Sequence, residues 1–262
     1  MIYFIIKIIV ARPLLSMKHI TRLYIDFIDA EKPFFLSSNQ ANHVARVMRK
    51  NIGDIIHIFN ASQGEYECII TEIKSMYVKV QATKQILDSQ HDKRKSAIAF
   101  GIIDQTRCKW LVEKATELDV CDIIPLCTKY SDKQSTWKRD KMQKVAIQAS
   151  EQCERLDIPN IYDPITLEDL FNSDIFAQYT KLACIERDMS RACICNTSFL
   201  YDTPYVFIVG PSGGFHQDET SFLIDKSNYT ISIGGNIQRT ETACISCLSY
   251  GYYKSLILEQ KK

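Results

Sequence analysis

The sequence has no strong excess of charge of either sign. Its 32 Lys and Arg residues and 31 Asp and Glu residues leave a formal net charge of +1 over 262 residues. This balance excludes a strongly basic, histone-like nucleic-acid binder, although a balanced total can hide a basic surface on one part of the molecule. The front of the chain has more basic than acidic residues, whereas the C-terminal part has more acidic than basic residues. We therefore expect a polyanionic partner to bind to the front of the chain.

The sequence also lacks an apolar run of the roughly 20 residues that a membrane span needs. The opening run, 1–10, is interrupted by Lys7. A secretory signal has basic residues before its apolar run and small residues after it, and this segment has neither. We interpret residues 1–16 as a non-essential extension before a chain start at Met17, and we expect a cytoplasmic protein without a membrane segment.

The ten cysteines follow no pattern that is typical of a disulfide framework or a zinc site. Cys244 and Cys247 form a CxxC pair, but on a predicted helix and without a second pair at zinc spacing. Cys193 and Cys195 also lack a second pair at zinc spacing. The sequence therefore predicts reduced thiols and no metal site.

The front of the chain consists of short β-rich segments separated by turn residues. We expect strands at 21–27, 55–59, 65–71 and 76–82 and one helix at 39–49. This spacing favours a small barrel. The polar segment 88–95 has no periodicity and is predicted to be a linker.

From residue 96 onward, apolar strands alternate with helices, which favours an α/β layer with a mostly parallel sheet. The expected strands are 97–103, 123–127, 182–185, 205–209 and 231–233, and the expected helices are 109–118, 136–154, one opening at Asp218, and 240–258.

The strand at 205–209 runs directly into the segment Gly210-Pro-Ser-Gly-Gly-Phe215. Three glycines let the backbone approach a ligand closely, and such loops bind ligands at the carboxyl ends of strands. Neither a G-x-G-x-x-G fingerprint nor a Gly-Lys-Ser/Thr sequence is present, which excludes a Rossmann dinucleotide site and a P-loop. Taken alone, the segment is equally well explained as a tight turn.

A second strand and glycine loop follow within 25 residues. The strand at 231–233 leads into Gly234-Gly-Asn236, and the last helix begins near Arg239. Thr240 is predicted to be the helix N-cap, and Glu241 lies in the first turn, where the helix dipole favours an acid. Two such loops would enclose a small cofactor largely with main-chain groups.

These loops resemble the paired cofactor-binding signature of the RsmE-type ribosomal-RNA uridine N3-methyltransferases of the SPOUT superfamily. Further segments resemble that family in the same order, so that the likeness extends from about Arg22 to Tyr250. They are 43–49 with 52–54, 114–120 with 124–125, and 151–155 with 158–159.

The resemblance implies an N-terminal PUA-like β-barrel at 17–90 that holds RNA and a C-terminal SPOUT α/β domain at 96–262 with a deep trefoil knot. It also implies a homodimer that methylates N3 of a uridine near the 3′ end of 16S rRNA, in the small ribosomal subunit, with S-adenosyl-L-methionine as cofactor. The cofactor-binding positions carried over are Gly210, Pro211, Gly213, Gly214, Ile233, Gly234, Ile237, Gln238 and Thr240.

Two positions depart from the family pattern. Ser212 stands where Glu is usual, and Gln238 stands where Leu is usual. Both departures favour an alternative, a catalytically silent RNA-binding factor in ribosome assembly that has lost the cofactor. A further alternative is a knotted methyltransferase that acts on another base or on transfer RNA.

Arg239 and Glu241 are the predicted catalytic residues. Methylation of N3 requires the N3 proton to leave, so a cation that stabilises the uridine anion and a base are both useful. Arg239 suits the first role. Glu241 is expected either to be the base or to orient Arg239.

The predicted RNA-binding residues are Arg22, Arg46 and Arg49, with Lys50 beside them, because such cations contact phosphates. A solvated surface is the alternative for each. Arg155 is the fourth predicted RNA-binding arginine. Its spacing from Glu151 predicts an ordinary i,i+4 pair, and the family resemblance assigns it to the substrate or a dimer interface. Trp110 and Trp137 are predicted to lie in the core or an interface.

Overall fold

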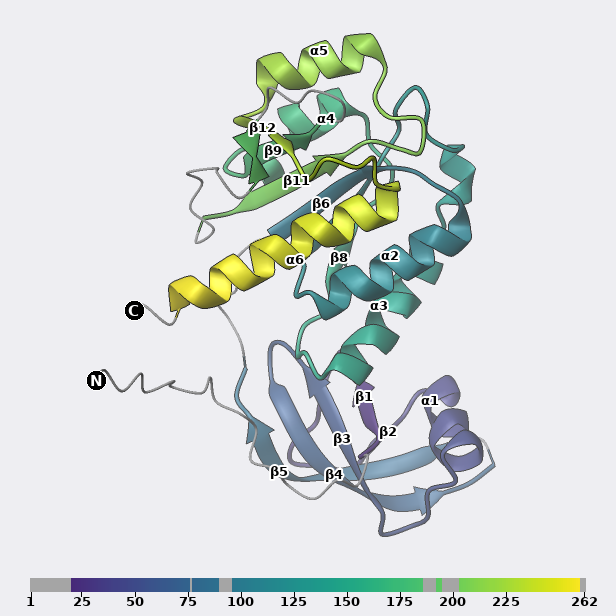
Figure 1. Cartoon of the computed structure of the whole chain (residues 1–262). Helices are drawn as coiled ribbons and strands as arrows, with labels where there is room; N and C mark the ends of the chain where they lie inside the picture. Colours follow the sequence, from purple (N-terminus) through teal and green to yellow (C-terminus); the bar gives the residue numbers. More distant parts are fainter. Residues whose placement is uncertain (1–19, 76, 90–95, 186–191, 195–202, 260–262) are drawn as a thin grey trace, which may run out of the picture. The chain divides into compact units, whose positions relative to one another are not determined.

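The structure is a computed structural model that describes residues 20–75, 77–89, 96–185, 192–194 and 203–259. The predicted extension, 1–16, and most of the predicted linker lie outside these residues. The described chain divides into two units, one ending at residue 89 and the other beginning at residue 96 (Figure 1).

The front unit is a five-stranded sheet with the order β1-β3-β4-β5-β2, in which β1 and β3 are parallel and the other pairs antiparallel. Its elements are β1 (Arg22–Tyr24), β2 (Phe34–Phe35), α1 (Ser38–Asn42), the π-helical turn η1 (His43–Val47), β3 (Ile55–Asn60), β4 (Gly64–Ile73) and β5 (Val78–Leu87).

The front sheet is strongly curled, in the manner of the small barrel that the strand spacing predicts (Figure 1). The register between β4 and β5 shifts at three places, and such bulges bend the strands that carry them. Within the described residues β1 and β2 remain the two edges of the sheet. The predicted strands at 55–59, 65–71 and 76–82 are confirmed and are longer than expected.

The strand expected at 21–27 is shorter, because a side chain takes over its hydrogen bonds. The Asn60 amide donates to the carbonyl oxygens of Ile25 (3.1 Å) and Asp26 (3.4 Å), so these groups need no strand partner. The helix expected at 39–49 starts with a capping box of Ser37 and Gln40, and continues as η1.

The second unit contains a seven-stranded sheet with the order β10-β12-β9-β11-β6-β7-β8, in which every pair is parallel. Its strands are β6 (Ser96–Gly101), β7 (Asp122–Leu126), β8 (Asn160–Ile161), β9 (Thr180–Cys184), β10 (Ala192–Cys193), β11 (Tyr205–Val209) and β12 (Tyr229–Ser232). Its helices are α2 (Gln105–Glu117), η2 (Gln134–Thr136), α3 (Arg139–Cys153), α4 (Leu167–Asn172), η3 (Asp174–Phe176), α5 (Gln217–Lys226) and α6 (Thr240–Glu259).

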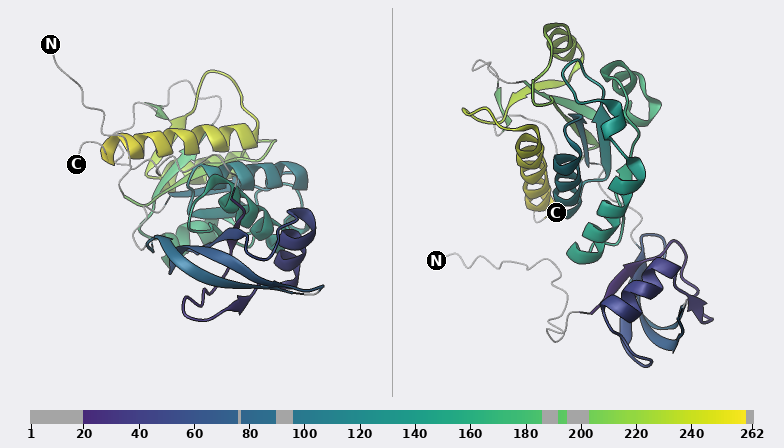
Figure 2. Two further views of the ribbon diagram at one scale, coloured as in Figure 1. Left: turned by 90° about the horizontal axis from the view of Figure 1, so that it is seen from below. Right: turned by 90° about the vertical axis from the view of Figure 1, so that its right-hand side faces the viewer.

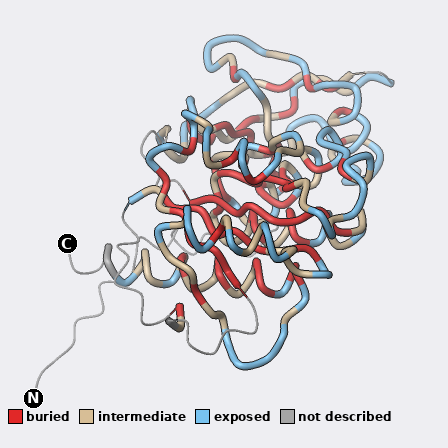
Figure 3. The backbone as a smooth tube through the Cα atoms, turned by 90° about the horizontal axis from the view of Figure 1, so that it is seen from above, coloured by how far each residue is buried: buried red, intermediate tan, exposed pale blue. Residues whose placement is uncertain are grey.

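Helices cover both faces of the parallel sheet, as Figures 1 and 2 show. One face packs against α2, α3 and α6, and the other against α4 and α5. Every residue of β6 and β11 is consequently buried, and these central strands form the buried interior in Figure 3. This confirms the predicted mostly parallel α/β unit, because strands buried on both sides read as continuous apolar runs.

Two helix starts differ from the sequence prediction. The α2 helix begins four residues before Lys109, because the Asp104 carboxylate accepts hydrogen bonds from the amides of Thr106 (3.0 Å) and Arg107 (3.1 Å). The α3 helix begins at Arg139 rather than at 136, since Trp137 is extended and buried. The Trp137 indole donates to the carbonyl oxygen of Tyr162 (3.0 Å), whereas Trp110 is 44% exposed.

Among the described residues, no helix is both long enough and apolar enough to span a bilayer.

Candidate functional site

Both glycine loops lie at the carboxyl ends of strands in the second unit. The first loop, 210–216, joins β11 to α5, and the second loop, 233–239, joins β12 to α6. The β9 strand lies between β11 and β12, so the two loops flank its end. This is the edge of a parallel sheet at which ligands bind.

A cleft of about 520 Å³ lies between the two loops. This is within the usual size range of small-molecule sites. Seven of the nine predicted cofactor residues line it, namely Gly210, Gly213, Gly214, Ile233, Gly234, Ile237 and Gln238. Its apolar floor was missed by the sequence analysis, and consists of Cys184, Ile185, Val209, Ile231 and Ala243. Part of the signal for this floor was available, because β9 and β11 end in the apolar residues Cys184 and Val209.

The other two predicted cofactor residues support the first loop from outside the cleft. Pro211 is buried against Gly101, where an added Cβ would lie 2.5 Å from the proline Cδ. Thr240 is the first residue of α6 rather than the N-cap that the sequence predicts, and its hydroxyl donates to the carbonyl oxygen of Gly210 (3.0 Å). Thr240 therefore ties the start of α6 to the first loop.

Both departures from the family pattern have partners within the protein. The Ser246 hydroxyl donates to Gln238 Oε1 (3.0 Å), which holds the Gln238 side chain at the wall of the cleft. The Ser212 hydroxyl accepts a hydrogen bond from Arg107 Nη1 (3.1 Å). All the glycines of the two loops are retained despite these two departures.

Comparison with known proteins agrees with this geometry. A family model described as an RNA methyltransferase domain matches residues 90–251, and one described as an RNA methyltransferase PUA domain matches residues 36–81. The chain belongs to this RNA methyltransferase family.

Two curated relatives are both named ribosomal RNA small subunit methyltransferase E. The one from Rickettsia conorii is 31% identical over 233 residues, which cover 87% of this chain and 93% of the relative. The one from Bacillus subtilis is 25% identical over 242 residues, which cover 88% and 94%. A solved structure of the Neisseria gonorrhoeae enzyme bound to S-adenosyl methionine superimposes with a TM-score of 0.77 at 19% identity, covering 88% of this chain and 96% of that one. The two-unit fold is thus that of solved methyltransferases.

The two predicted catalytic residues of this methyltransferase occupy different environments. Arg239 is exposed at the end of the second loop. Glu241 is buried, with its Oε2 3.5 Å from Arg107 Nη1. Neither lines the cleft itself. Glu241 therefore has a cationic partner other than Arg239.

Arg107 is a residue of this region that the sequence analysis missed. Its Nε donates to Asp104 Oδ2 at the start of α2, and this hydrogen bond raises the pKa of Arg107 and lowers that of Asp104. The sequence alone offered no signal for it, because the position of Arg107 beside the first loop depends on β6 and β11 being neighbours that end at the same edge of the sheet.

The CxxC thiols are core residues of the methyltransferase domain. Cys244 and Cys247 are both buried on α6, and Cys247 Sγ lies 3.4 Å from Cys184 Sγ. Burial raises the pKa of the Cys244 thiol, and the contact with Cys184 raises that of Cys247. Across the described part of the chain, no group of three or more potential ligands is arranged to hold a metal.

Two of the four predicted RNA-binding arginines are buried in ion pairs. Arg22 lies 3.0 Å from Glu65 and 3.5 Å from the centre of the Phe59 ring. Arg155 lies 2.6 Å from Asp157 Oδ2 and donates to the Thr116 carbonyl oxygen (2.8 Å). Neither guanidinium reaches a phosphate without breaking these contacts.

The predicted i,i+4 pair of Arg155 with Glu151 on one helix is wrong, because α3 ends at Cys153. Glu154 then adopts a left-handed conformation with φ of 64°, which turns the chain before Arg155.

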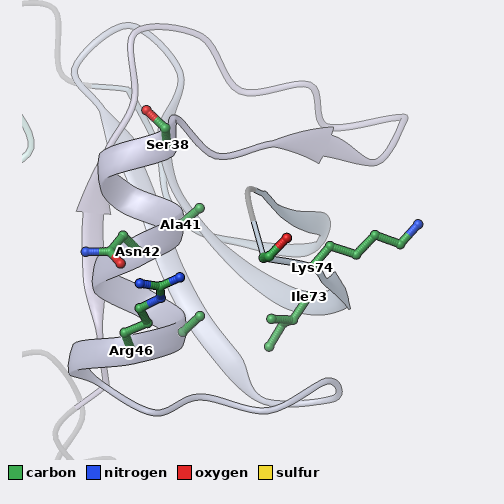
Figure 4. Close-up of a pocket in the computed structure, with 8 residues that line it drawn as sticks. Ser38, Ala41, Asn42, Arg46, Ile73 and Lys74 are labelled. Atoms are coloured by element: carbon green, nitrogen blue, oxygen red, sulfur yellow. The ribbon is translucent and has the colours of Figure 1, made fainter.

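The other two arginines, Arg46 and Arg49, are exposed in the front unit. Arg46 borders a groove of about 450 Å³ between the helical segment and the end of β4 (Figure 4). Asn42 lies beside Arg46 on this segment, and Lys74 and Ile73 lie on the opposite side. The groove is thus lined by the apolar residues Ala41, Ala45 and Ile73 and bordered by the exposed Arg46, whereas Lys74 Nζ lies 2.6 Å from Glu72 Oε1.

Proposed function

We propose that this methyltransferase uses S-adenosyl-L-methionine to methylate N3 of a uridine near the 3′ end of 16S rRNA, in the small ribosomal subunit. The observation that carries the proposal is the cleft between the two glycine loops. It occurs in a chain whose family is that of RNA methyltransferases and whose curated relatives are named for small-subunit ribosomal RNA.

The residues of the cleft fit this cofactor. Its apolar floor suits an adenine ring, and Ser232, Asn236 and Gln238 on its walls offer polar groups for the ribose and amino-acid parts. The glycines leave main-chain groups accessible, so most of the binding does not depend on particular side chains. Bound there, S-adenosylmethionine supplies an electrophilic methyl group.

In the proposed reaction the uridine N3–H bond breaks and its proton leaves to solvent, an N3–CH3 bond forms as the bond from that methyl group to the sulfonium sulfur breaks, and S-adenosylhomocysteine would leave. Arg239, which is exposed beside the second loop, stabilises the uridine anion as its proton leaves. Glu241 acts as a positioning residue rather than as the base. Its burial and its ion pair with Arg107 support this assignment.

RNA is held by the front unit in this proposal. Arg46, Arg49 and Lys50 contact phosphates, and the groove beside Arg46 receives part of the strand. Arg22 and Arg155 are assigned to the fold instead, because both are buried and already paired.

We further propose that the enzyme is a cytoplasmic homodimer and that the second unit contains the trefoil knot. Exposed apolar side chains on α2 and α6, namely Trp110, Tyr253 and Ile257, support a dimer interface on these helices. The resemblance to the knotted family and the all-parallel sheet support the knot.

Calorimetric titration with S-adenosylmethionine tests the cofactor proposal. Gly214→Trp would fill the cleft and abolish binding, because an added Cβ at Gly214 points into open space there. Gly53→Trp is the matched control, since Gly53 also has a positive φ and open space but lies in the front unit. Binding that the first variant abolishes and the control retains supports the proposal. RNA from a deletion strain should then lack one N3-methyluridine.

Absence of binding to the wild-type protein, with and without ribosomal subunits, would favour a silent assembly factor. The substitutions at Ser212 and Gln238 are the features that favour this alternative. Their hydrogen bonds to Arg107 and Ser246 count against it, because both side chains are held at the wall of an intact cleft.

A further inference from the structure

Arg107 joins three segments that are far apart in the sequence. It lies in the first turn of α2, where its Nε donates to Asp104 Oδ2. Its Nη1 donates to Ser212 Oγ in the first loop (3.1 Å) and to Glu241 Oε2 at the start of α6 (3.5 Å). One side chain thus contacts the first wall of the cleft and the helix that follows the second wall.

The charges around Arg107 indicate an internal role. Asp104 and Glu241 are its ion-pair partners, and Asp132 is a third carboxylate close enough to raise the pKa of Arg107. Three carboxylates outweigh the single positive charge of the guanidinium, so this cluster has no net positive charge to attract RNA phosphates. The hydrogen bonds of Arg107 are directional, however, and a planar guanidinium can orient several acceptors at once.

A second side-chain hydrogen bond joins α6 to the first loop. The Thr240 hydroxyl joins α6 to the beginning of the first loop at Gly210. Arg107 joins α6 to the middle of the same loop at Ser212. The two contacts together limit how far the first loop can move relative to the helix that carries Glu241.

We propose that Arg107 is a positioning residue of the methyltransferase site, which holds the first glycine loop and Glu241 in the arrangement that binds the cofactor. The inference rests on the proposed function for its catalytic meaning. A site that is held in place before binding loses less conformational freedom when its ligand arrives.

Arg107→Gln and Arg107→Lys in the full-length protein test this role. Arg107→Gln should weaken S-adenosylmethionine binding about tenfold, because it removes hydrogen bonds between charged groups. Arg107→Lys should recover part of this loss, since a lysine retains the charge but not the fork of donors. Arg139→Gln is the matched control, because Arg139 forms an exposed pair with Asp163 in the same unit.

Hydrogen exchange of the free protein gives a second readout that does not depend on the cofactor. In Arg107→Gln, amides of 210–214 and 240–244 should exchange at least several-fold faster than in the wild type, whereas those of α3 should not change. If the wild type fails to bind the cofactor, the proposed function fails, but the exchange rates still decide the role of Arg107. Unchanged exchange and unchanged affinity would overturn the inference.

A double-mutant cycle with Ser212→Ala tests the specific contact. Ser212→Ala should lower cofactor affinity in the wild-type background and have little further effect in Arg107→Gln, because the two residues form one hydrogen bond. Independent, additive losses would show that Arg107 does not act through Ser212. A change in kcat for RNA methylation at saturating cofactor, beyond the change in KM, would show that Glu241 is also misplaced.

Discussion

Each unit contains an arginine that pairs with a glutamate, and the two pairs differ in how deeply they are buried. In the front unit the side chains of Arg22 and Glu65 are 5% and 1% exposed, and His57 Nδ1 lies 2.9 Å from the same carboxylate. In the second unit the side chains of Arg107 and Glu241 are 33% and 11% exposed and lie beside the cleft. The first cluster joins neighbouring strands of a sheet, and the second joins loops. We therefore expect changes in the first to affect folding and changes in the second to affect ligand binding.

The largest expected effect is that of Glu65→Gln on the stability of the front unit. The substitution leaves Arg22 buried without its carboxylate, and breaking a buried pair in this way costs about 3–5 kcal/mol. Both tryptophans lie in the second unit, so hydrogen exchange of β3 and β4 amides is the appropriate measurement. Cofactor affinity should not change.

Glu72→Gln is the matched control for this comparison. Glu72 pairs with Lys74 on the surface, with side-chain exposures of 34% and 61%, so its loss should change the stability of the front unit far less than Glu65→Gln does. Equal small losses for both variants would show that burial does not distinguish the two pairs.

The next effect concerns the second unit, where Thr240→Val removes the hydroxyl that ties α6 to Gly210. The carbonyl oxygen of Gly210 loses its donor while the shape of the side chain is retained, and cofactor affinity should fall by about tenfold. Calorimetric titration with S-adenosylmethionine measures this affinity. Thr242→Val, at an exposed position two residues later, should bind like the wild type. A wild-type affinity for Thr240→Val would contradict the assigned support of the first loop.

A smaller effect is expected from the exposed cations of the front unit. Arg46→Ala and Arg49→Ala should each reduce the slope of log affinity for RNA against log salt concentration by about 0.7, the value for one phosphate contact with a single strand. Lys32→Ala, another exposed cation of the same unit, is the control. Stability should change by no more than about 0.5 kcal/mol. A slope unchanged in both arginine variants would remove them from the RNA interface.

The smallest effect at neutral pH involves the buried carboxylate of Asp122, which accepts hydrogen bonds from neutral side chains. Asp122 accepts hydrogen bonds from the hydroxyls of Tyr179 (2.7 Å) and Tyr162 (3.1 Å). Burial raises the pKa of Tyr162 to about 12 and also raises that of Tyr179.

A tyrosine pKa that is raised in the folded protein makes stability depend on alkaline pH. Below about pH 10, the usual value for tyrosine, both states are protonated and the stabilisation is complete. As the pH rises from about 10 to about 12, only the unfolded chain loses its proton, so stability should fall. Urea unfolding should show this fall in the wild type and a smaller one in Tyr162→Phe. An identical pH dependence would contradict the assignment.

Much of the second unit was predictable because its elements are periodic and long. The buried strand at 205–209 and the closing helix at 240–258 agree with β11 and α6 to within a residue. The short elements β8 and α4 were not predicted, since two to six residues carry too little periodicity to be recognised.

Two of the ends of predicted segments that moved did so for tertiary reasons. The strand expected at 21–27 ends at Tyr24 because the Asn60 side chain, 35 residues away, takes the carbonyl of Ile25. The helix expected from 136 starts later because Trp137 is drawn into the core beside Phe100. Neither partner is visible in a local stretch of sequence.

Sequence by itself determined the two glycine loops, the alternation of strands and helices, and the likeness to RNA methyltransferases, because all three depend on residue types at short spacing. Tertiary structure decided which cations are available to a ligand. The sequence alone does not distinguish Arg22, Arg46, Arg107 and Arg155. In the structure Arg22 and Arg155 are buried and paired with carboxylates, whereas Arg46 is exposed. Arg107 reaches the cleft only because β6 and β11 are neighbours in the sheet, a pairing of segments more than 100 residues apart in the chain.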